Sequence, residues 1–216
     1  MLKKIKRNWW KLLLVLVAVI LLAGVFVLTR PDTYLPHKRI VLHVPYDLND
    51  PPTSIIPMGE TIYHPKPQVP SGHPGIDFQW GHPDAKILAS AAGVITSIKQ
   101  TPEHYNNWDI EVGSWPYVVR YKELEDYDHG LKTGSHVQAG QFLGYPENNS
   151  AKGAQAAIQI HWEFASLSTT RDRFCPMTYF DEASRQSVEA IWAKSTWQYK
   201  NQFPDVCSGD YKNKVE

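Results

Sequence analysis

A His-Pro-Gly-Ile-Asp segment places an imidazole, His73, and a carboxylate, Asp77, four positions apart. The intervening proline lacks an N–H and the intervening glycine disfavours a helix interior, so we expect a bend that leads into a strand. A bend of this kind can aim both side chains at one point. An imidazole nitrogen and a carboxylate oxygen suit Zn²⁺, which needs at least one further protein ligand. The natural candidate is His161, in an apolar stretch much later in the chain.

The stretch around His161 has the alternation of a strand. Its large apolar side chains fall on one face and its polar ones on the other, which separates Ile158, Ile160, Trp162 and Phe164 from Gln159, His161 and Glu163. The apolar face predicts a core contact. A histidine on the opposite face points into a cleft or toward solvent, so we expect His161 to be available for ligation.

These side chains need a scaffold, and residues 73 to about 165 have the pattern of an antiparallel β domain. Short β-branched runs at 86–89, 93–98, 108–112 and 117–121 are separated by Gly, Pro and Asn. Residues 137–145 predict a turn that feeds another strand. No stretch in this region sustains a helical period.

The amino terminus has the pattern of a membrane anchor. Residues 12–28 are seventeen consecutive residues without a charged or polar side chain, preceded by Trp9 and Trp10 as interfacial anchors. Five cations and no acid lie within residues 1–11, so the positive-inside rule predicts a cytoplasmic amino terminus and a main domain outside, periplasmic or extracellular. The competing interpretation is a cleaved signal peptide. We favour an uncleaved, single-pass signal anchor, because the apolar run exceeds the usual signal-peptide length and no clean small-x-small site follows it.

The chain divides into four segments. Residues 1–30 are the basic tip and transmembrane signal anchor, and residues 31–71 form a proline-rich spacer with an accessory strand at 39–44. Residues 72–178 form the β domain. Residues 179–216 hold a helix and tail, with Val188, Ile191, Trp192 and Tyr199 at helical spacing over 181–199 and Asp181 or Ser184 available as the N-cap.

The cysteines and the charge balance bear on a possible disulfide and on the class of partner. Cys175 and Cys207 both follow the anchor, and an even count on the exported side permits one disulfide, although two separate buried thiols remain an alternative. Lys and Arg number 22, as do Asp and Glu, so beyond residue 11 there are 17 basic and 22 acidic residues. A mildly acidic body without a basic stripe argues against a nucleic-acid partner.

Several motifs together give a family resemblance. The Gly72–Phe78 segment and the following Ile87–Ile95 segment resemble the opening of lysostaphin-like (LytM-type) zinc metallopeptidases. Val118–Leu124, Gly134–Gly144 and His161–Phe164 fit the rest of that domain in the same order. The resemblance covers roughly residues 72 to 165. It implies a mainly β fold with an antiparallel LytM-type peptidase core, flanked here by an amino-terminal transmembrane helix and a carboxy-terminal helix.

The resemblance also implies a cofactor and a substrate. Zinc would be held by His73, Asp77 and His161, with a water in the fourth position. Two histidines and a carboxylate with an open position are a catalytic rather than a structural zinc set. Such a zinc ion lowers the pKa of its water and polarises the scissile carbonyl. Family members cleave peptide bonds in bacterial cell-wall peptidoglycan, a substrate that suits a domain held outside the membrane.

The sequence departs from the family at both usual catalytic histidines. The place two residues before the last ligand is Gln159, and the Tyr-x-His-Leu element reads Tyr121-Lys122-Glu123-Leu124. In one interpretation the enzyme works differently. Glu123, on the strand face of Val119 and Tyr121, would be the general base, and Gln159 would donate to the developing oxyanion.

Two other interpretations stay open. The domain could be catalytically degenerate, binding zinc or peptidoglycan and regulating a partner wall hydrolase. It could also be a membrane-anchored structural module in which the metal only stabilises the fold, which would require a fourth protein ligand. Retention of all three presumed ligands favours a bound metal, and we place hydrolysis ahead of the alternatives.

Overall fold

The computed structural model describes residues 9–29, 40–102, 106–148, 158–167 and 172–211. Within these ranges the strands are β1 (Ser54–Ile56), β2 (Ile76–Trp80), β3 (Ile87–Leu88), β4 (Gly93–Thr101), β5 (Asn107–Ser114), β6 (Tyr117–Tyr127), β7 (His136–Val137), β8 (Phe142–Asn148) and β9 (Ile158–Ser166). The α-helices are α2 (Trp9–Thr29) and α4 (Glu182–Lys194). Short 3₁₀ helices are η3 (Pro176–Thr178), η4 (Lys200–Gln202) and η5 (Gly209–Tyr211).

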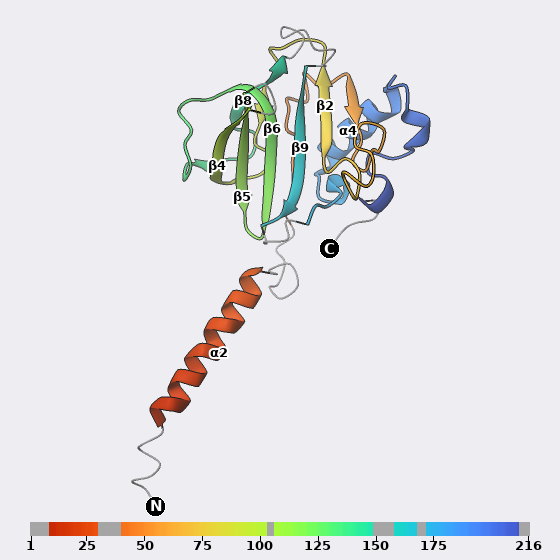
Figure 1. Ribbon diagram of the computed structural model, residues 1–216. Helices are drawn as coiled ribbons and strands as arrows, with labels where there is room; N and C mark the ends of the chain where they lie inside the picture. Colours follow the sequence, from red (N-terminus) through yellow and green to blue (C-terminus); the bar gives the residue numbers. More distant parts are fainter. Residues whose placement is uncertain (1–8, 30–39, 103–105, 149–157, 168–171, 212–216) are drawn as a thin grey trace, which may run out of the picture.

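One twisted antiparallel sheet holds all of these strands (Figure 1). Its order is β1-β2-β9-β8-β6-β5-β4-β7, with β3 paired to β8 and an additional β6–β9 pairing. The mainly β, antiparallel core predicted from the sequence is confirmed. Strand β9 lies inside the sheet between β2 and β6, so the polar side chains of three neighbouring strands meet around it.

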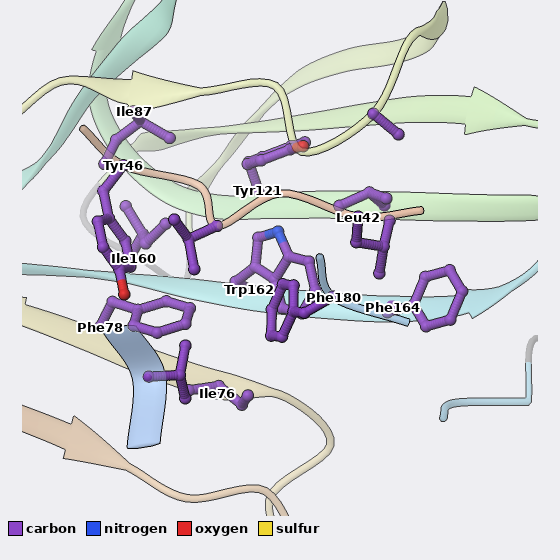
Figure 2. Packing of buried hydrophobic residues seen from close by; sticks show 14 of the residues in the cluster. Leu42, Tyr46, Ile76, Phe78, Ile87, Tyr121, Ile160, Trp162, Phe164 and Phe180 are labelled. Carbon is purple, nitrogen blue, oxygen red and sulfur yellow. The ribbon is translucent and has the colours of Figure 1, made fainter. Parts of the chain in front are cut away.

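The apolar face of β9 forms the centre of the core. Ile160, Trp162 and Phe164 are buried as their alternation predicts, whereas Ile158 at the strand end is only half-buried. Figure 2 shows these side chains packed among residues from β2, β6 and the segments that flank the sheet. The Trp162 ring stacks on Phe180 with ring centroids 5.7 Å apart. Large aromatic side chains of this kind contribute much of a core's buried area.

The carboxy-terminal helix begins where the sequence predicts and ends earlier. The Asp181 carboxylate accepts a hydrogen bond from the Ser184 backbone N–H at 2.8 Å, so Asp181 is the N-cap of α4. Val188, Ile191 and Trp192 are buried on one side of the helix. The predicted extension to residue 199 is wrong, because the chain turns to extended backbone at the C-cap, Ser195, where ψ is 130°.

The accessory strand predicted at 39–44 is not formed; residue 39 lies outside the described residues, and 40–46 make only isolated bridges. Leu42 bridges to Phe180 and Tyr46 to Ile87. The backbone N–H groups of this segment donate to three different parts of the chain: Leu42 to Tyr179, His43 to Ser90 and Val44 to the Ser184 hydroxyl. Because the partners do not lie on one neighbouring strand, no continuous ladder can form. The strand that does form in this proline-rich region is β1.

The predicted disulfide is confirmed. Cys175 and Cys207 are bonded, which ties the tail to the segment that follows β9. The tail continues against residues 57–59, where Met58 and Cys207 form a parallel bridge. Gly59 has φ +82°, and a Cβ there would lie 2.1 Å from the Ser208 carbonyl oxygen. A glycine is therefore required where these two segments cross.

The amino-terminal helix is present as α2, which Figure 1 draws apart from the sheet. Its described apolar side chains are exposed; Leu14, Ile20 and Leu22 have exposed fractions of 57%, 61% and 69%. Among the residues that the structure describes, no helix has both the length and the apolarity required to cross a membrane. The transmembrane part of the sequence prediction is thus not confirmed.

Candidate metal centre

Strands β2 and β9 bring the two ends of the candidate site together. Asp77 and His161 are direct partners in the β2–β9 register, and His73 lies three residues before β2. The Asp77 Oδ1 atom is 2.8 Å from His161 Nδ1 and 3.0 Å from His73 Nε2. The two imidazole nitrogens are 2.9 Å apart. The three donor atoms thus form one triangle, although His73 and His161 are 88 positions apart in the chain.

Two glycines allow the bend at His73 to come this close. Gly72 has φ +74°, and a Cβ there would lie 2.7 Å from the Glu60 carbonyl oxygen. A Cβ on Gly75 would lie 2.4 Å from the Trp162 carbonyl oxygen and 2.9 Å from His161 Nε2. The backbone of His73 bonds to residues 59 and 60 on both its N–H and C=O sides, which fixes the bend. Gly72 therefore allows close approach of residues 59 and 60, and Gly75 allows close approach of β9.

The donor set fits zinc. Zinc–nitrogen and zinc–oxygen bonds of about 2.0–2.1 Å place tetrahedral ligands about 3.3 Å apart, so the three atoms need to separate by only a few tenths of an ångström. Two histidines and one carboxylate match a catalytic zinc set. A closed structural zinc site would require a fourth protein ligand. Among the described residues, no fourth His, Cys, Asp or Glu belongs to this group.

Outer hydrogen bonds orient both imidazoles. His73 Nδ1 donates to the Pro57 carbonyl oxygen at 3.1 Å, which leaves Nε2 facing the other donors. His161 Nε2 donates to Glu163 Oε1 at 3.1 Å, which leaves Nδ1 facing them. Histidines that bind metals are commonly held in this way by a carbonyl or a carboxylate on the opposite ring nitrogen.

Glu163 is the most heavily bonded of these outer groups. It is fully buried and accepts from Arg120 Nη1 at 2.7 Å, Arg173 Nε at 2.9 Å and Lys122 Nζ at 3.2 Å, besides His161. Burial alone would favour its neutral form. The hydrogen bond from His161 and the charges of His161, Lys122 and Arg173 outweigh burial and hold the pKa of Glu163 well below its usual range.

The two carboxylates also act on the imidazole between them. Burial disfavours a charged His161, but hydrogen bonds to Asp77 and Glu163 outweigh it and raise the pKa of His161 from 6.5 to about 10. Burial likewise opposes ionisation of Asp77, and the charge of His73 with hydrogen bonds to both histidines lowers the pKa of Asp77 well below its usual range. The metal-free triangle therefore holds a proton that a metal ion must displace.

The polar face of β9 is buried, which differs from the sequence prediction of a cleft or solvent. His161 is 7% exposed and Glu163 is fully buried. Neighbouring strands supply the cover, because Lys122 and Arg120 on β6 stand opposite His161 and Glu163 in the register. Simple alternation cannot detect this, since a charged pair on a second strand can bury a polar face as well as an apolar core can.

Glu123 and Gln159 lie together on the polar face. The Gln159 side-chain N–H donates to Glu123 Oε2 at 3.2 Å, and Gln159 Oε1 accepts from Gln79 at 3.0 Å. Gln159 is two residues from His161 on β9, so both side chains share a face. The structure therefore brings Glu123 and Gln159 together on the face of β9 that carries His161.

The predicted strand face of Glu123 is wrong for a physical reason. Val119 and Tyr121 are fully buried in the core, so regular alternation would send Glu123 inward with them. Instead Glu123 has φ +67°, and the pairing of β6 with both β5 and β8 shifts register around Leu124. This bulge turns Glu123 to the polar face beside Lys122. A non-glycine residue at positive φ is strained, and such strain is often found at functional sites.

Sequence reasoning missed His64. Its ring stacks on His73, with centroids 4.3 Å apart and planes inclined by 22°. Glu60, fully buried, holds His64 Nδ1 at 2.9 Å and also accepts from the Tyr63 backbone N–H at 2.7 Å. These hydrogen bonds to His64 and the backbone outweigh burial and lower the pKa of Glu60. A Glu-x-x-x-His spacing in a proline-rich segment is the only sequence signal, and it is weak.

The sequence profile of Peptidase family M23 matches residues 71–172, which include the donor triangle, Glu123 and Gln159. Residues 71–172 belong to peptidase family M23. The family resemblance noted in the sequence is thereby confirmed. A comparison with curated proteins finds no match.

Solved structures of similar fold include three bacterial proteins. Csd3 of Helicobacter pylori is 19% identical with a TM-score of 0.47, covering 70% of this chain and 39% of that one. Lysostaphin of Staphylococcus simulans is 20% identical with a TM-score of 0.49, covering 64% and 53%. A zinc-containing peptidase from Vibrio cholerae is 21% identical with a TM-score of 0.44, covering 60% and 38%. The chain thus spans between two fifths and about half of the length of these proteins.

Proposed function

We propose that this M23 domain binds one zinc ion through His73, Asp77 and His161 and hydrolyses peptide bonds of bacterial cell-wall peptidoglycan. The observation that carries the proposal is the donor triangle with edges of 2.8–3.0 Å, each imidazole oriented from outside. A scaffold without a metal would gain little from burying two histidines against a carboxylate. Family membership supplies the expectation of a peptidase.

The residues have distinct roles in this proposal. When bound, zinc would acidify water and polarise the scissile carbonyl. Glu123 accepts the proton of the attacking water and passes it to the leaving amine, because a carboxylate beside the metal is a competent general base. Gln159 holds Glu123 in the resting state through its 3.2 Å hydrogen bond. In the transition state its N–H donates to the developing oxyanion.

Hydrolysis of purified sacculi tests this proposal. The full-length chain is loaded with zinc, and released peptides are separated and counted with and without a chelator. We expect release that the chelator abolishes. Glu123→Gln keeps the size and hydrogen bonding of the side chain and removes its basicity, so we expect zinc content to stay and release to fall by at least a hundredfold. Glu125→Gln, at an exposed position two residues further on β6, is the matched control.

One observation favours a second candidate function. The Gln159 amide is engaged on both sides, by Glu123 and by Gln79, so a catalytic role falls to its second side-chain N–H. A degenerate domain that binds zinc or peptidoglycan and regulates a partner wall hydrolase requires no such donor. Full zinc occupancy with no release from sacculi at several pH values, and with no difference between the Glu123 and Glu125 variants, would establish this alternative.

We further propose that residues 1–30 anchor the protein at the cell membrane, with its amino terminus in the cytoplasm and the M23 domain outside. The support is the exposed apolar surface of α2 and the five cations within residues 1–11. Protease added to intact spheroplasts tests it. We expect the domain to be digested and an amino-terminal tag to be protected; release of the whole protein by a salt wash would contradict the anchor.

A further inference from the structure

A small polar cavity lies on the same face of the sheet as the donor triangle. Its volume is about 220 Å³. It is lined by Lys99 on β4, Asp109 and Glu111 on β5, Arg120 and Lys122 on β6, and Arg173 beyond β9. Four cations and two carboxylates thus surround one opening, and the fully buried Glu163 lies behind it, bonded to three of those cations.

The cations have more hydrogen-bonding capacity than the nearby acids use. Arg120 is 5% exposed and donates through Nε to Glu111 and through Nη1 to Glu163, while its Nη2 is buried and has no hydrogen-bond partner among the described residues. Arg173 donates to Glu163 through Nε, and its side chain is 32% exposed. The Lys99 ammonium is 60% exposed and 3.9 Å from Asp109.

A purely structural role does not explain this arrangement. Four cations face three carboxylates, Asp109, Glu111 and Glu163, and His161 also contacts Glu163. A buried guanidinium with an unsatisfied N–H costs free energy unless another acceptor completes it. An anion with two or more acceptor oxygens would suit these cations, because a planar guanidinium pairs best with a carboxylate.

We propose that this cavity binds a carboxylate of the peptide substrate, so the domain selects acidic peptides. This rests on the proposed function for the identity of the ligand as a peptide. Lys122 stands opposite His161 in the register, and Glu163 bridges His161 to the cations. Those contacts place the cavity beside the donor triangle, so the recognised carboxylate lies close to the scissile bond.

Matched peptides test the proposal. The full-length chain, held metal-free by a chelator so that no peptide is cut, is titrated into fluorescein-labelled tetrapeptides and anisotropy is followed. One peptide carries Glu and a free carboxyl terminus; the others replace Glu by Gln, amidate the terminus, or do both. We expect the doubly neutral peptide to bind at least tenfold more weakly, since a charge-assisted contact of this kind is worth about that factor. The single replacements show which carboxylate is recognised.

Variants locate the site. Arg173→Gln and Lys99→Gln should each reduce binding of the acidic peptide severalfold and leave the neutral peptide unchanged. Lys99→Gln does not touch Glu163, so it reports on the cavity even if Arg173→Gln disturbs folding. Arg185→Gln, the same change at an exposed site on α4, is the control.

Equal binding of acidic and neutral peptides overturns the proposal. So does the absence of measurable binding of any peptide, or unreduced binding of the acidic peptide by both cavity variants. If inorganic phosphate displaces the acidic peptide at micromolar concentration, the cavity is a phosphate site and the carboxylate proposal is wrong. Because the measurement is made without metal, its outcome is independent of whether the protein hydrolyses sacculi.

Discussion

Removing the charge of Glu163 tests how the donor triangle is supported. In Glu163→Gln the amide can still accept from His161 but no longer compensates the cations that donate at 2.7–3.2 Å. Breaking a buried ion pair on one side costs about 3–5 kcal/mol. The side chains of Lys122 and Arg173 are each 32% exposed and can rehydrate, so we expect the lower end, about 3 kcal/mol.

The same change weakens zinc binding. Outer carboxylates that hold a metal-binding histidine contribute roughly 10–100-fold in metal affinity, and Glu163 is the partner of His161 Nε2. For a chain of this size, about 3 kcal/mol corresponds to a melting temperature lower by roughly 6–12 °C. Zinc affinity is measured by competition with a chromophoric chelator, and stability by thermal unfolding of the metal-free protein.

The control is Glu189→Gln, at an exposed position on α4 where an oxygen is 3.9 Å from Arg185. We expect this variant to match the unaltered protein in both assays. If Glu163→Gln lowers stability while zinc affinity stays within twofold, Glu163 only neutralises the cations and does not orient His161. If neither quantity changes, the charge network around Glu163 has been misread.

Three further predictions concern the same centre. Because the pKa of His161 is raised from 6.5 to about 10, its contribution to metal-free stability is complete below about pH 6.5 and is lost as pH rises toward 10. Zinc affinity should rise over that window by roughly tenfold per pH unit, as competition titrations would show; a flat profile contradicts it. Gly75→Ala should abolish stoichiometric zinc in metal analysis, whereas Gly81→Ala, where a Cβ meets nothing within 4 Å, should retain it. His64→Ala should lower zinc affinity by about tenfold and His64→Phe, which preserves the stack on His73, by much less; equal losses would rule out stacking as the contribution of His64.

Residue type and spacing predicted those features of the fold that depend only on neighbouring residues along the chain. The bend at His73, the apolar face of β9 and the N-cap at Asp181 follow from residue type and spacing, and the structure has all three. The sequence also brought Glu123 and Gln159 into consideration, through comparison with the family pattern rather than through geometry.

The remaining features depend on contacts between distant segments. The bulge that redirects Glu123 arises where β6 pairs with two different strands, and no single-strand pattern records it. Burial of Glu163 requires Arg120 from another strand, and the stack of His64 on His73 requires the spacer to fold back over the site. The segment at 40–46 has strand-like residues, yet its hydrogen-bond partners are dispersed.

The most direct test of the central claim is X-ray absorption spectroscopy at the zinc edge of the purified full-length chain, with metal content measured on the same sample. We predict one zinc ion per chain, bound by two imidazole nitrogens and by oxygen ligands at about 2.0–2.1 Å. His161→Ala should lose the metal. A chain that takes up no zinc, or a zinc ion that shows sulfur ligands or persists unchanged in His161→Ala, would contradict the account.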